Sequence, residues 1–159
     1  MLLDFKKDLE AAKPAEKLVL DTFASLATGY SFTDVSEDRE YYYKGDIKAI
    51  APDGKEIYIE VKNDSRIADT GRILCEEENY IKECDYYING NMRGSCDYYC
   101  IVSEKERLIY VLDFKILKSI YKRYGEFKII YHSQQDTHCY LLDLCWAVSK
   151  GALIHKLKY

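Results

Sequence analysis

Hydrophobic and polar positions alternate along residues 44–62, which have the sequence KGDIKAIAPDGKEIYIEVK. In the second half of this stretch, one strand face carries Ile57, Ile59 and Val61, and the other carries Tyr58, Glu60 and Lys62. Between the halves, Ala51-Pro52-Asp53-Gly54 contains the residues that a tight chain reversal needs. The pattern predicts a β-hairpin with one face packed in a core and one polar face.

Helical periodicity marks the N-terminal segment. Apolar residues recur at helical spacing at Ala15, Val19, Phe23 and Leu26, and Gly29 is a typical stop. We expect a helix over residues 4–27 that is interrupted or restarted at Pro14, since proline is favoured in a first helical turn. Residues 30–43 are polar and aromatic and are expected to form a connector.

Short strands and one more helix are expected after the hairpin. The predicted strands start at residues 72–76 and then cover residues 97–102, 108–114, 127–131 and 138–144. Asp113 is expected to cap an amphipathic helix that ends at Gly125. Residues 84–95 carry turn signals, and a short basic tail follows residue 149. This order predicts one α+β domain over residues 1–159, with a mixed central sheet flanked by helices.

Candidate chemistry is concentrated on the hairpin. Asp46 lies at the head of the first strand, and Glu60 and Lys62 share a face of the second. If Asp46 and Glu60 face the same side, two carboxylates and a lysine converge at one point. Such a set of oxygen ligands is suited to a hard divalent cation beside a water or a substrate phosphate.

The order Gly45-Asp46, hairpin, Glu60-Val61-Lys62 resembles the PD-(D/E)xK nuclease superfamily, which has the restriction-endonuclease-like fold. Gly45 replaces the proline of the family's name. Thr70-Gly71 with Glu76, and the strand that begins at Asp97, also resemble segments of small phage and bacterial nucleases in this superfamily. The resemblance implies a mixed central sheet flanked by helices and a metal-dependent endonuclease that hydrolyses phosphodiester bonds in DNA.

The resemblance also implies roles for individual residues. Asp46, Glu60 and the carbonyl of Val61 would hold one or two Mg²⁺ or Mn²⁺ ions. Lys62 would orient or deprotonate the attacking water, or offset charge on the scissile phosphate. Glu16, on the first helix, would lean into the site as a further catalytic carboxylate. Glu76 would be an additional site residue.

Some of these residues also have purely structural interpretations. Glu16 could instead complement the dipole of a helix that restarts at Pro14. Arg66 and Arg72 lie in the loop after the hairpin, where they could bind nucleic-acid phosphates or simply be solvated. Glu76 opens an acidic run, and such runs are typical of solvated edges.

Composition restricts the kind of binding surface, the state of the cysteines and the cellular location that we expect. The net charge of −4 excludes a general basic coat but not a local basic cleft. The six cysteines and three histidines show no zinc-ligand spacing, so we expect reduced core cysteines. No apolar run could span a membrane, and acidic residues near the start argue against a signal peptide, which indicates a cytoplasmic protein without membrane partners.

Three functional alternatives stay open on the sequence. The first is a DNA endonuclease, for which a homodimer is expected because cutting both strands commonly uses two sites. The second is a nuclease for RNA or branched DNA. The third is a catalytically inactive nucleic-acid-binding relative, in which Glu60 and Lys62 form only a surface pair.

Overall fold

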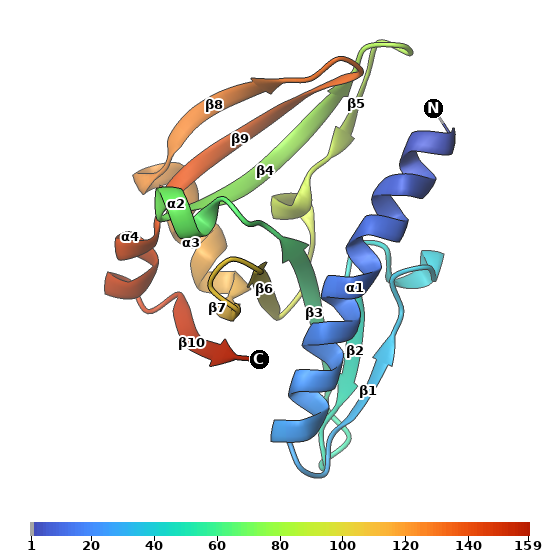
Figure 1. Cartoon of the computed structure of the whole chain (residues 1–159), viewed down its shortest axis with the longest axis vertical. Coiled ribbons are helices and arrows are strands. Elements are labelled where there is room, and N and C mark those ends of the chain that lie inside the picture. The colour runs from blue at the N-terminus through green and yellow to red at the C-terminus, as the bar shows by residue number, and fades with distance from the viewer. Residues whose placement is uncertain (1) are drawn as a thin grey trace.

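Two β-sheets, joined by the chain that leaves the hairpin, organise the protein (Figure 1). The computed structural model describes the backbone of residues 2–159 and the side chains of residues 10–159. The elements in chain order are α1 (Leu2–Leu26), β1 (Ser31–Asp34), η1 (Arg39–Tyr41), β2 (Ile47–Ile50), β3 (Glu56–Asn63), α2 (Ile67–Thr70), β4 (Arg72–Ile81), β5 (Tyr86–Asn89), η2 (Asn91–Arg93), β6 (Tyr98–Ser103), β7 (Leu108–Asp113), α3 (Phe114–Tyr124), β8 (Glu126–Tyr131), β9 (Gln135–Asp143), α4 (Leu144–Ser149) and β10 (Leu153–Lys158).

The first sheet has six strands in the order β1-β2-β3-β6-β7-β10. Its neighbours are antiparallel except for β3 and β6, which run parallel. Helix α1 lies along β1 and β3 (Figure 1), and its Ala15 and Val19 pack against Ile59 and Val61 of the hairpin. The apolar face predicted for β3 therefore forms a core, which leaves the polar face for the site.

The second sheet is antiparallel, with four strands in the order β5-β4-β9-β8. Helices α3 and α4 pack between this sheet and strands β7 and β10 of the first sheet. As predicted, Asp113 caps α3, since its Oδ1 accepts a hydrogen bond of 2.9 Å from the Ile116 amide. The core on this side is built around Tyr99, Phe114 and Leu117, all fully enclosed.

The predicted α+β class with a mixed sheet and flanking helices is confirmed, and several local predictions are corrected. Helix α1 is continuous through Pro14, so the expected interruption is wrong: the packing of Ala15 and Val19 on the sheet holds the helix together across the proline. The connector, the turn region and the tail contain β1, β5 and β10, and α4 was not expected. These short elements are largely exposed and owe their form to strand pairing, which local sequence does not encode.

Both sheets border the hairpin because of the order in which the strands follow one another along the chain. Strand β3 leads through α2 into β4, so the last residues of β3 lie where the two sheets diverge (Figure 1). Strand β5 then returns through η2 to the start of β6, which pairs with β3. Residues from both sheets therefore surround the polar face of the hairpin. Over residues 2–159, no helix combines the length and apolar character that membrane crossing would require.

Candidate active site

Gly45 fixes the position of Asp46 at the head of β2. Its φ is +135°, and a Cβ there would lie 2.7 Å from the carbonyl oxygen of Ile59, so a larger residue would push the strands apart. The Asp46 amide donates to that same carbonyl at 2.9 Å, while the Asp46 carbonyl accepts from the Val35 amide at 2.8 Å. Asp46 therefore lies beside Glu60 because of a close strand approach that glycine permits.

The Asp46 carboxylate is held by the backbone of the neighbouring strand. Its Oδ2 accepts a hydrogen bond of 2.8 Å from the Val61 amide. Desolvation, with a smaller contribution from the charges of Glu16 and Asp34, raises the pKa of Asp46 to about 6, while this hydrogen bond opposes the shift. Asp46 is thus oriented by the protein, yet its negative charge is poorly compensated.

Glu60 is the least compensated acid of the hairpin. Its carboxylate makes no hydrogen bond and no ion pair with any residue whose side chain is described, although Ile59 and Val61 on either side are buried. Desolvation and then the charge of Asp46 raise the pKa of Glu60 to about 8, while the charge of Lys62 opposes the shift. Two adjacent carboxylates that both resist ionisation provide oxygen ligands for a cation.

This donor set fits Mg²⁺ or Mn²⁺ only in part. Among the side chains of residues 10–159, no three carboxylate, imidazole or thiol groups converge as a complete cage. Asp46 and Glu60 would therefore need backbone carbonyls and waters to complete the coordination, which is the usual arrangement for Mg²⁺. The carbonyl of Val61, between Glu60 and Lys62, is the backbone group that the resemblance implies for this purpose.

Lys62 is paired with a carboxylate from the second sheet. Its Nζ lies 2.6 Å from Oε1 of Glu76, which is on β4. The two residues are 14 positions apart in sequence and meet because β3 continues through α2 into β4. The structure therefore brings Glu76 next to Lys62, where it holds the Lys62 ammonium on the polar face of the hairpin.

Glu16 is buried under the site, at 3% exposure, in the middle of α1. The Ser36 hydroxyl donates to its Oε2 at 2.9 Å, and the Nζ of Lys13 lies 3.2 Å from the same oxygen. Its charge contributes to the raised pKa of both Asp46 and Glu60. The alternative of a first-turn glutamate is wrong, because α1 runs without interruption from Leu2 to Leu26 and Glu16 lies well inside it.

A cavity of about 190 Å³ opens beside the two hairpin carboxylates. It is lined by Ser36, Tyr42, Tyr43, Gly45, Asp46, Glu60, Asn89, Gly90, Asn91, Gly94 and Cys96. Sequence reasoning missed the part of this lining that comes from residues 36–43 and 89–96. The run of tyrosines before Gly45 and the Asn89-Gly90-Asn91 sequence were visible, but nothing local indicated that they meet.

Comparison with known proteins gives one structural similarity. No family model matches the chain, and no curated protein matches it in sequence. Among solved structures, a bacterial homing endonuclease, I-Ssp6803I, is similar over 80% of this chain and 74% of its own, at 15% identity and a TM-score of 0.48. The site described above does not depend on this similarity.

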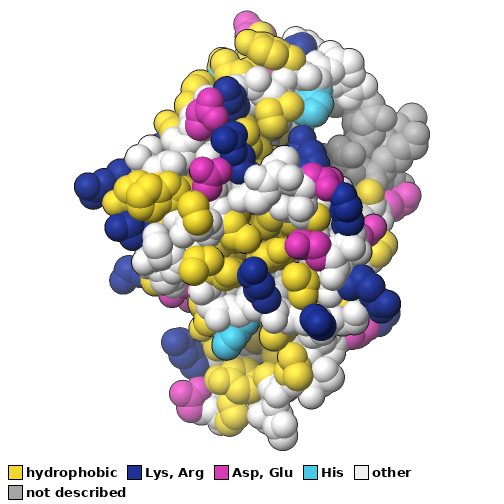
Figure 2. Space-filling view, turned by 60° about the vertical axis from the view of Figure 1, so that its left-hand side comes forward, with side chains coloured by type: hydrophobic (Ala, Val, Ile, Leu, Met, Phe, Trp, Pro, Cys, Tyr) yellow, Lys and Arg dark blue, Asp and Glu magenta, His cyan; other side chains and the backbone are white. Residues whose placement is uncertain are grey.

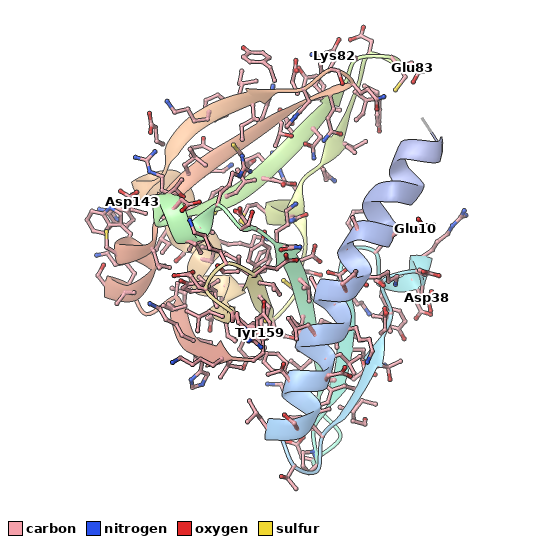
Figure 3. All side chains as sticks on the ribbon, in the orientation of Figure 1. Glu10, Asp38, Lys82, Glu83, Asp143 and Tyr159 are labelled. Carbon is pink, nitrogen blue, oxygen red and sulfur yellow. The ribbon has the colours of Figure 1, made fainter. Side chains whose placement is uncertain are left out.

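The two predicted phosphate-binding arginines lie away from the carboxylate cavity. Arg72 pairs with Asp143 at 3.0 Å and with Glu126 at 3.2 Å, and Figure 3 shows Asp143 on the opposite side of the molecule from Asp38. Arg66 is exposed and lies 3.7 Å from Asp64. Both arginines line a second cavity, of about 430 Å³, between α2 and the second sheet.

Basic residues are also dispersed elsewhere. On the face shown in Figure 2, lysine and arginine side chains are scattered among acidic and hydrophobic ones and form no continuous stripe. Nucleic-acid binding at this face would therefore rest on local contacts, in keeping with the net charge of −4.

Proposed function

We propose that the protein is a metal-dependent nuclease that hydrolyses phosphodiester bonds in DNA. The observation that carries the proposal is the pair Asp46 and Glu60: two neighbouring carboxylates at a cavity, both with a raised pKa, and with no cation of the described chain against Glu60. A structural acid pair would be expected to have a cation partner or to be fully solvated. The resemblance of Asp46 and Glu60-Val61-Lys62 to the PD-(D/E)xK motif supports the same function.

In this proposal the hairpin supplies the metal ligands. Asp46, Glu60 and the carbonyl of Val61 would hold Mg²⁺ or Mn²⁺, which would lower the pKa of a bound water and offset charge on the reacting phosphate. The Val61 amide keeps Asp46 in place through the bond to its Oδ2. The close backbone approach at Gly45 places Asp46 next to the strand that carries Glu60.

Lys62 would act on the water or on the phosphate. Its ammonium is paired with Glu76 on the polar face that Glu60 also shares, and it has further N–H donors available. These donors can orient the attacking water or stabilise the negative charge that builds up on the phosphate oxygens. Glu76 would be a positioning residue for Lys62. Glu16, on α1, would add negative charge near the metal site.

A cleavage assay with matched variants tests the proposal. Wild-type protein with Mg²⁺ or Mn²⁺ should cut DNA, and EDTA should stop the reaction. Asp46→Ala, Glu60→Ala and Lys62→Ala should each lower the rate by about 10²–10³-fold or more, because each removes an electrostatic group of the transition state. Glu56→Ala is the control, since Glu56 is a glutamate of the same strand that pairs with Lys48 away from the cavity.

Substrate arms distinguish the alternatives. The assay should include single-stranded, duplex and branched DNA and an RNA of the same sequence. Cutting of RNA alone would overturn the DNA assignment, and cutting that survives all three hairpin substitutions would overturn the site. Calorimetric titration with Mn²⁺ gives a readout apart from activity: binding in the wild type that is lost in Asp46→Ala and Glu60→Ala would support the ligand assignment.

A further inference from the structure

The cavity next to the carboxylates has two acidic residues in an otherwise uncharged lining. Of its lining residues, only Asp46 and Glu60 are charged; the others are aromatic, amide, hydroxyl, thiol or glycine groups. Its volume of about 190 Å³ is below that of pockets for drug-sized ligands, which begin at roughly 300 Å³. The part at Asp46 and Glu60 thus suits a metal and a phosphate. The uncharged part of the lining suits one small, flat, uncharged group.

Two tyrosines of the lining have free ring faces. Tyr42 and Tyr43 are 64% and 59% exposed, and their rings contact each other edge to face, with centroids 5.2 Å apart. Neither stacks on any other ring among the described side chains. By contrast, the preceding Tyr41 stacks on Tyr58 and lies beneath the Nζ atoms of Lys44 and Lys48.

The backbone at Tyr43 is tied to the segment that precedes β6. The carbonyl of Tyr43 accepts hydrogen bonds from the amide and the hydroxyl of Ser95, at 2.8 and 3.0 Å. Because the backbone of this loop is already ordered, less conformational entropy is lost when a ligand stacks on its aromatic rings. The pair is therefore a prepared stacking surface at the cavity.

Two asparagines add hydrogen-bonding groups to the same cavity. Asn89 makes no side-chain hydrogen bond in the described part of the chain, and Asn91 uses only its Nδ2, which donates to the Tyr99 hydroxyl at 3.3 Å. Between them, Gly90 approaches β4 so closely that a Cβ would lie 2.4 Å from the carbonyl oxygen of Glu76. The amides are thus held at the cavity, and an amide presents the donor and acceptor pair that matches the edge of a base.

We propose that this cavity receives one unstacked nucleobase of the DNA strand that is cut, so that the protein prefers substrates with unpaired nucleotides at the cleavage position. The base would stack on Tyr42 or Tyr43, and its edge would face Asn89 and Asn91. A base inside a duplex cannot do this, because both of its faces are stacked and its edge is paired. The inference rests on the proposed nuclease function, which places the adjoining phosphate at Asp46 and Glu60.

Binding measurements with full-length protein test the inference. Ca²⁺ replaces Mg²⁺, because it takes the same oxygen ligands in a looser geometry that is poorly suited to the reaction. Fluorescence anisotropy compares a labelled DNA strand of mixed composition with a blunt duplex of the same sequence. The single strand should bind at least about tenfold more tightly, and Tyr43→Ala should reduce its affinity by about tenfold, the effect typical of losing one base–aromatic stack.

Two further variants separate stacking from folding effects. Tyr43→Phe keeps the ring and should retain the affinity of the wild type for the single strand. Tyr86→Ala removes a tyrosine that is 63% exposed on β5 but does not line the cavity, and it should change neither affinity. A 2-aminopurine base in the strand should change its fluorescence on binding to wild type and much less on binding to Tyr42→Ala/Tyr43→Ala.

The outcomes separate this inference from the nuclease proposal. Hairpin-dependent cleavage with equal affinity for single strand and duplex, or an affinity that is unchanged in the double tyrosine variant, overturns the base pocket and leaves the nuclease. Failure to bind any of the DNA substrates overturns the base pocket, and absence of cleavage that depends on Asp46, Glu60 and Lys62 overturns the nuclease.

Discussion

Glu60 on β3 and Glu77 on β4 are two acids of the protein interior with opposite surroundings. Glu77 is 7% exposed, and its two oxygens face Arg93 at 3.0 Å and Lys122 at 3.1 Å. The charge of Asp46 raises the pKa of Glu60 more than that of Lys62 lowers it, and no described side chain forms an ion pair with the Glu60 carboxylate. The cations at Glu77 tie η2 and α3 to the second sheet, so that acid serves the fold.

The two acids differ in whether the protein itself compensates their negative charge. Enclosing a carboxylate costs free energy unless a cation or hydrogen bonds compensate it. At Glu77 the cations of Arg93 and Lys122 provide this compensation, whereas no cation among the described side chains pairs with Glu60. This contrast, more than the presence of an acid and a lysine in the motif, supports the metal site proposed above.

The largest effect should be on catalysis. Glu60→Gln removes the charge of a proposed metal ligand at constant size, so the cleavage rate should fall by about 10²–10³-fold or more, while Glu77→Gln should cleave within about twofold of the wild type. Single-turnover kinetics with saturating DNA measure this. Equal losses in the two variants would show that the contrast between the two acids is unrelated to chemistry.

The next effect concerns pH and stability without metal. The ordinary pKa values of Asp46 and Glu60 are 3.8 and 4.5, and the fold raises them to about 6 and about 8. The folded protein therefore binds more protons than the unfolded chain between these values, so stability should decrease as the pH rises from about 4 to about 8. The part due to the two acids should be about 2–3 kcal/mol, allowing for their contact with solvent in the cavity.

Urea unfolding in EDTA, at several pH values, measures this decrease. The comparison is Asp46→Asn/Glu60→Gln, in which the decrease should largely disappear. Adding Mn²⁺ should stabilise the wild type more at high pH than at low pH, since protons compete with the metal for the same oxygens. A wild-type stability that rises over this pH range relative to the double variant would contradict the raised pKa values.

A smaller effect, of opposite sign for the two acids, is expected in metal-free protein at about pH 8. Glu60→Gln should stabilise the fold by about 1–2 kcal/mol because it removes an uncompensated charge, and Glu77→Gln should destabilise it by a similar amount because it breaks two ion pairs to half-exposed cations. Urea midpoints of the two variants measure this. The same sign in both variants would be incompatible with the contrast.

The smallest expected effect is on Mn²⁺ affinity, when the Ser36 hydroxyl that contacts Glu16 is removed. Ser36→Ala removes the hydroxyl that contacts Glu16, Lys13 and Asp34, so Mn²⁺ affinity should fall about threefold to tenfold, the range expected for lost hydrogen bonds. Calorimetric titration measures this. Ser25→Ala is the control, since the hydroxyl of Ser25 donates only to the Thr22 carbonyl on the exposed side of α1. An unchanged Mn²⁺ affinity in Ser36→Ala would separate Glu16 from the metal site.

Local chemistry accounts for what could be predicted. The turn at residues 51–54 forms as expected, with the Gly54 amide donating to the Ala51 carbonyl at 2.8 Å. The alternation along β3 correctly separated the core face from the polar face, and Asp113 caps α3. These features depend on residues one to four positions apart, where φ/ψ preferences and side-chain periodicity act directly.

The sequence by itself thus determined the hairpin, the faces of its strands and the acids and lysine that it presents, because these follow from local geometry. Only the tertiary structure decided which acids are compensated. Lys62 meets Glu76, Glu77 meets Lys122, and Glu16 meets Ser36 through contacts between distant segments. It also decided that Tyr42, Tyr43, Asn89 and Asn91 enclose one cavity with Asp46 and Glu60. Such meetings depend on how two sheets and a helix pack together, which no short stretch of the chain encodes.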